Sequence, residues 1–65
     1  MYKEGMRVVM TEDAHSMYGT YEDNPAGVQG VVLGSNSNAR GWYDVKWDNG
    51  GFNSYQDGDL IVVSE

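Results

Sequence analysis

The sequence predicts a small all-β domain, and three observations indicate this fold class. Short runs of β-branched and aromatic residues are separated by turn-forming residues, and nine of these are glycines. No window has the 3.6-residue apolar spacing of an amphipathic helix. The 65 residues, 40% of them apolar, suffice for a single small core, so we expect one domain over residues 1–65.

The first strand is expected at residues 7–10, where two valines and a methionine follow a glycine-containing entry. Residues 11–27 are mostly polar or small, which predicts a long loop after that strand. Structureless connections of this length are uncommon in compact domains and are often functional. Because Tyr18 and Tyr21 lie within the segment, we expect it to pack against another surface.

The later strands are separated by clear turn signals. Residues 41–48 have the strongest alternation, with Tyr43, Val45 and Trp47 on one face. Asn49-Gly50 then predicts a tight hairpin, because both residues tolerate the positive φ angles of a type I′ turn. The remaining strands are expected at residues 28–33, with a bulge at Gly30, and at residues 52–55 and 60–63.

The number of residues in this hairpin turn decides which face of the following strand is buried. A two-residue turn places Trp47 opposite Phe52 in the core, with Tyr55 outside beside Trp42. A three-residue turn reverses the faces of that strand. Under the two-residue register, the predicted core consists of Val8, Val31, Val45, Trp47, Phe52 and Leu60.

Five short strands with this order of loops fit a small, strongly bent SH3-like barrel, which leaves few exposed edges. An OB-fold is the second choice, because it usually has longer strands and often a helix. The sequence also resembles the MIB/HERC2 domain family at residues 5–9, 27–32 and 41–50 and at Asn53-Ser54-Tyr55, and more loosely at residues 17–24. The most specific part is Trp47-Asp48-Asn49-Gly50 followed by Asn53-x-Tyr55. Met17, Tyr18 and Gln56 depart from the family pattern.

The resemblance implies an SH3-like barrel that recognises proteins, including short peptide segments, without catalysis. We therefore expect a non-enzymatic module that binds a peptide segment or surface of a protein partner. A module of this kind that stands alone is expected to be a small viral or bacterial accessory protein. The expected surface joins the long loop to the outer face of residues 41–55. Its aromatic anchors are Tyr18, Tyr21, Trp42 and Tyr55, and its polar contacts are Asp44, Lys46 and Asn53. Simple packing of these rings under the loop explains them equally well.

Composition excludes several kinds of site. With no cysteine and with His15 alone, expected in a solvated loop, we predict no catalytic residues, no metal site and no cofactor. The four basic residues are dispersed and the net charge is −6, so binding to a nucleic-acid backbone is not expected. No apolar run is long enough to cross a membrane, and the first residues lack the basic region and apolar stretch of a secretory signal, so an intracellular, cytoplasmic protein is expected.

The acidic balance also allows a different function. A compact anionic protein can mimic nucleic acid and occupy the basic cleft of a nucleic-acid enzyme. The carboxylates available for such a face are Glu12, Asp13, Glu22, Asp23, Asp44, Asp48, Asp57 and Asp59.

Overall fold

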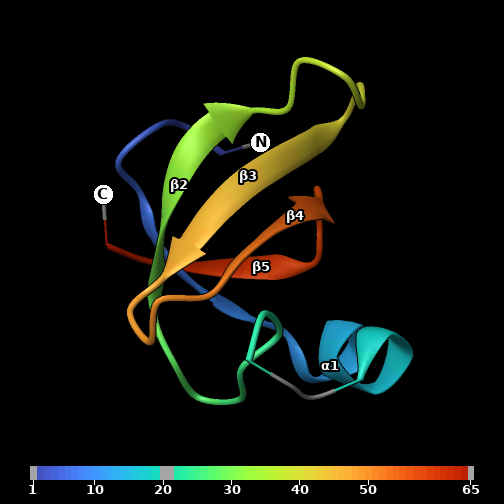
Figure 1. Ribbon diagram of the computed structural model, residues 1–65, viewed down its shortest axis with the longest axis vertical. Coiled ribbons are helices and arrows are strands. Elements are labelled where there is room, and N and C mark those ends of the chain that lie inside the picture. Colours follow the sequence, from blue (N-terminus) through green and yellow to red (C-terminus); the bar gives the residue numbers. More distant parts are fainter. Residues whose placement is uncertain (1, 20–21, 65) are drawn as a thin grey trace.

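A computed structural model describes residues 2–19 and 22–64, and it confirms the all-β class (Figure 1). Five antiparallel strands form one strongly bent sheet in the order β4-β3-β2-β1-β5, which is the strand order of an SH3-like barrel. The elements are β1 (Arg7–Met10), α1 (Glu12–Tyr18), β2 (Gly30–Ser35), β3 (Trp42–Trp47), β4 (Phe52–Gln56) and β5 (Leu60–Ser64). Among the described residues, no helix is long and apolar enough to cross a membrane.

Strand β2 begins two residues later than expected, and its irregularity lies elsewhere. The pairing of β2 with β3 shifts between Val32 and Gly34, not at Gly30. Gly30 instead permits close packing, because a Cβ there would lie 2.6 Å from Cε3 of Trp47. The glycine is thus needed for contact with the largest core side chain.

The short helix α1 corrects the prediction that residues 11–27 lack regular structure. Thr11 caps its start, with Oγ1 accepting a hydrogen bond from the Ala14 amide at 3.1 Å. At its end, Gly19 adopts a φ of 87° and its amide donates to the His15 carbonyl at 2.9 Å. Consequently His15 lies in a helix and is partly buried, contrary to the expected solvated loop position.

The β3–β4 hairpin uses the three-residue turn. The Trp47 amide donates to the Gly51 carbonyl at 2.8 Å, and Lys46 pairs with Phe52. Gly50 has a φ of 95°, the conformation that a three-residue hairpin requires before its strands resume pairing. The predicted positions on β4 are therefore wrong: Phe52 is 49% exposed and Tyr55 is 1% exposed.

The core lies on the concave side of the bent sheet. The predictions for Val8, Val45, Trp47 and Leu60 are confirmed, whereas Val31 is only partly buried and Phe52 is exposed. Val32 occupies the place predicted for Val31, because strand residues alternate between the two faces. The full buried cluster consists of Val8, Val32, Tyr43, Val45, Trp47, Tyr55 and Leu60.

Tyr2 ties the beginning of the chain to the start of β5. Its hydroxyl donates to the Leu60 carbonyl at 2.8 Å and accepts from the Gly58 amide at 3.0 Å. Its ring packs edge-on against Tyr43, with the centroids 5.1 Å apart. A side chain thereby adds a link beside the β1–β5 ladder.

Candidate functional site

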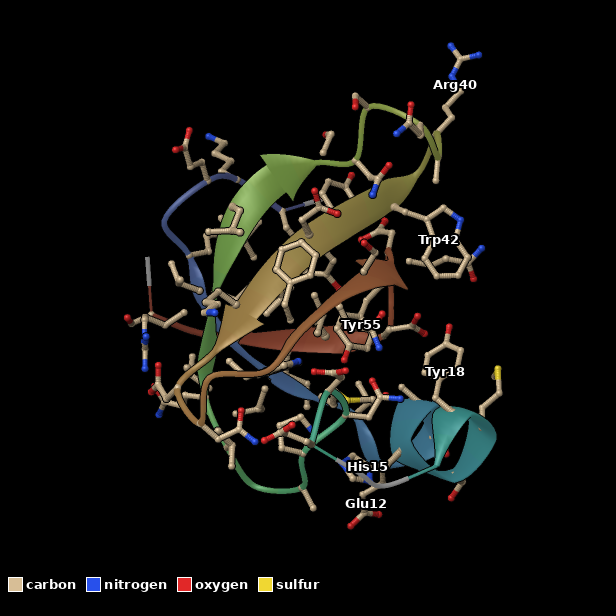
Figure 2. All side chains as sticks on the ribbon, in the orientation of Figure 1. Glu12, His15, Tyr18, Arg40, Trp42 and Tyr55 are labelled. Carbon is tan, nitrogen blue, oxygen red and sulfur yellow. The ribbon has the colours of Figure 1, made fainter. Side chains whose placement is uncertain are left out.

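An aromatic pocket of about 280 Å³ lies where the end of α1 meets the hairpin. Figure 2 shows Tyr18, Trp42 and Tyr55 on the same side of the molecule. These three rings and three polar residues line the hollow. We call the set of six the aromatic pocket: Tyr18, Asn24, Trp42, Asn53, Ser54 and Tyr55. Four of the seven predicted site residues are therefore brought together, namely Tyr18, Trp42, Asn53 and Tyr55.

Tyr18 reaches the pocket because it is the last residue of α1. Its hydroxyl donates to Asp59 Oδ2 at 2.7 Å, which holds the ring against the turn before β5. This hydrogen bond raises the pKa of Tyr18 above its ordinary value, so the phenol remains neutral. Its ring centroid lies 6.1 Å from that of Tyr55, at an interplanar angle of 57°.

Tyr55 belongs both to the pocket and to a buried hydrogen-bond network. Its hydroxyl accepts from Trp47 Nε1 at 3.1 Å, and it lies within donating distance of the Asp23 carbonyl, at 2.7 Å, and of Asn24 Oδ1. Asn53 Nδ2 also donates to Asn24 Oδ1, at 3.1 Å. Because Asn24 is 1% exposed, these bonds satisfy a side chain that would otherwise be costly to bury.

The segment that carries Asn24 is clamped to the hairpin turn. Asn49 Nδ2 donates to the Glu22 carbonyl at 3.1 Å, and the Phe52 amide donates to Asp23 Oδ1 at 3.2 Å. The contact is close enough that a Cβ on Gly51 would lie 2.3 Å from the Glu22 carbonyl oxygen. The hairpin thus fixes the position of one pocket wall.

The other predicted site residues lie outside the pocket lining. Asp44 Oδ1 accepts from Ser54 Oγ at 2.6 Å and from Asn36 Nδ2 at 2.8 Å, so it stands directly behind a lining residue. Lys46 Nζ donates to the Gly50 carbonyl at 3.2 Å, toward the hairpin turn. Tyr21 lies outside the described residues.

Sequence reasoning missed Asn24 and Ser54. The Asn24 side chain is buried where it can bond with the Tyr55 hydroxyl. That hydroxyl lies inside the protein only because the hairpin has a three-residue turn, which the sequence alone did not settle. Ser54 pairs with Asp44 in that register, so the alternation of β4 would have indicated it once the turn was known.

Elsewhere the structure offers a second, open hollow of about 440 Å³ beside the start of α1. It is lined by Met10, Thr11, Glu12, His15, Ser16, Ala26 and Gly27. Within residues 2–19 and 22–64, no group of three or more histidine and acidic side chains could hold a metal ion. The aromatic pocket, unlike the second hollow, contains four of the predicted site residues. Its rings, amides and hydroxyl groups suit the binding of a side chain.

Comparisons with protein-family models, with curated proteins and with solved structures find no match to the chain. The functional argument consequently depends on the residues and their geometry.

Proposed function

We propose that the protein is a non-enzymatic interaction module that binds a peptide segment of a protein partner in the aromatic pocket. The observation that carries the proposal is the convergence of Tyr18, Trp42 and Tyr55 from three separate elements on one hollow. Aromatic side chains offer large contact areas with few rotatable bonds, and they are enriched among residues that dominate binding energy.

The size and lining of the pocket favour a peptide side chain. Its volume of about 280 Å³ lies at the lower limit of the roughly 300–1,000 Å³ typical of small-molecule sites. The mixture of three rings with Asn53 and Ser54 resembles the centre of a protein interface, where aromatic contacts are accompanied by a few hydrogen bonds. The resemblance to the MIB/HERC2 family supports the same function.

The test is selection of binding peptides from a random displayed library on the immobilised protein, followed by affinity measurements on two variants. Trp42→Ala removes a pocket ring, whereas the matched control Phe52→Ala removes an exposed ring from β4 that does not line the pocket. Loss of an anchor side chain should weaken binding by about 2 kcal/mol or more, or roughly thirtyfold. Phe52→Ala should bind normally.

Two results would contradict this proposal. One is failure to select any peptide, and the other is an equal loss of affinity in both variants with their folds intact. The alternative function, mimicry of nucleic acid, would be favoured by a different result. The protein would then bind a nucleic-acid enzyme strongly, the binding would weaken with salt, and added DNA would displace the protein from the enzyme.

A further inference from the structure

The rings of the aromatic pocket are arranged so that one bound group can contact more than one of them. Tyr18 and Tyr55 have centroids 6.1 Å apart and are tilted by 57°, and Trp42 lines the same hollow. A cation within about 6 Å of an aromatic centroid is attracted to the negative face of the ring, and tryptophan is the strongest partner. Tyr18 and Trp42 are partly exposed, whereas Tyr55 is 1% exposed and backs the hollow, so a positive charge there can interact with the rings of Tyr18 and Trp42.

Two carboxylates stand immediately behind the pocket wall. Asp59 Oδ2 is 2.7 Å from the Tyr18 hydroxyl, and Asp44 Oδ1 is 2.6 Å from Ser54 Oγ. A charge in contact with either hydroxyl group is thus within about 8 Å of a carboxylate, which is the screening length at physiological ionic strength. Both acidic groups therefore favour a positive charge in the pocket.

Within the described residues, no basic side chain forms an ion pair with Asp44 or Asp59. In the described part of the chain, the recorded ion pair joins Arg7 to Asp48, and Lys46 Nζ donates to the carbonyl of Gly50. Arg40 points away from the aromatic pocket (Figure 2). None of the described residues that line the pocket is basic, and the net charge of −6 adds a long-range attraction for a positively charged partner.

We infer that the aromatic pocket receives the cationic side chain of a lysine or arginine in a basic peptide segment. This inference rests on the proposed function and adds to it the chemical class of the partner. Rings and nearby carboxylates contribute together: the rings contact the apolar stem and attract the charged end of the side chain, and the carboxylates add to the attraction of that charge.

The experiment compares two small probes of nearly the same shape, Nα-acetyl-lysine methylamide and its uncharged analogue Nα-acetyl-norleucine methylamide. Each is titrated into the ¹⁵N-labelled protein, and chemical shifts are followed by NMR. The lysine probe should give saturable shifts at the Trp42 indole and bind at least about tenfold more tightly than the norleucine probe. Raising the salt concentration should weaken the lysine probe alone.

Three variants test the role of the carboxylates. Asp44→Asn and Asp59→Asn should each weaken the lysine probe while leaving the norleucine probe unchanged. Asp48→Asn is the matched control, because it removes the same charge from a carboxylate paired with Arg7 away from the pocket. It should alter lysine binding less than either of the other two, with thermal unfolding confirming that all three variants fold.

The outcomes separate the inference from the proposed function. Two results would overturn the inference that the pocket receives a cationic side chain but would leave the proposed peptide binding standing. One is equal binding of both probes, and the other is no binding of the lysine probe while library peptides still bind through Trp42. Failure of the probes and of all library peptides overturns both. Lysine binding that is lost in Trp42→Ala and retained in Phe52→Ala supports both.

Discussion

Replacing Tyr55 by phenylalanine removes one oxygen atom from the centre of the buried network and leaves the ring in place. The Trp47 Nε1–H group loses its acceptor at 3.1 Å, while Asn24 keeps the hydrogen bond from Asn53. Leaving one buried donor unsatisfied costs about 1–3 kcal/mol. A loss of about 2 kcal/mol corresponds to a fall of roughly 8–16 °C in the unfolding temperature of so small a domain.

Tyr43→Phe is the matched control for this substitution. Tyr43 belongs to the same core, but among the described residues its hydroxyl makes no recorded hydrogen bond. Its removal should change the free energy of unfolding by less than about 0.5 kcal/mol. Urea unfolding followed by circular dichroism measures both variants, and equal destabilisation of the two would refute the assigned role of the Tyr55 hydroxyl.

Three further predictions concern the core, the close packing of β2 and the exposed ion pair. Trp47→Ala should cost about 3–5 kcal/mol and unfold the domain, so a native circular dichroism spectrum at room temperature would contradict the core assignment. Gly30→Ala should lower the free energy of unfolding by about 1–3 kcal/mol, because the new Cβ would lie 2.8 Å from the Lys46 carbonyl oxygen. Thermal unfolding measures this loss, and unchanged stability would show that the backbone can move to accept the methyl group. The hydrogen bond from Arg7 lowers the pKa of Asp48 below its ordinary value of 3.8. The ion pair therefore stabilises the fold above that ordinary value, and this contribution is lost as the pH falls through the lowered pKa. Asp48→Asn should accordingly lower the urea midpoint slightly at pH 6, by an amount that shrinks as the pH falls through the lowered pKa, and a difference that stays constant from pH 6 into the acid range would exclude this linkage.

The sequence predicts the strands well because their residue types are distinctive, and it predicts the faces of β2 and β4 poorly. Val31, Val32 and Leu33 are all apolar, so the alternation of β2 contains no internal indication of which valine points inward. On β4, the burial of Tyr55 depends on a single additional turn residue. A local ambiguity of one residue is enough to exchange the two faces of a strand.

The helix and two polar residues of the pocket, Asn24 and Ser54, were missed for another reason. Helix α1 has seven residues and buries only Ala14, which is too little for a periodic apolar pattern. Its start depends on the side chain of one capping residue, Thr11. The rings of Tyr18 and Trp42 were identified because eight aromatic residues are more than one small core can enclose, so some were expected at the surface. Asn24 becomes recognisable only when its tertiary partners are known.

The position of β1 between β2 and β5 affects the order in which the chain can fold. Strand β1 is the first of the five in the sequence and is internal to the sheet, yet one of its two neighbours is β5, the last of the five. Tyr2 likewise meets its hydrogen-bonding partner 58 residues later, at Leu60. Contacts of such long sequence separation are slow to form because a large loop must close first. During translation, β2, β3 and β4 can pair as successive hairpins, but the core is completed only after β5 has been synthesised.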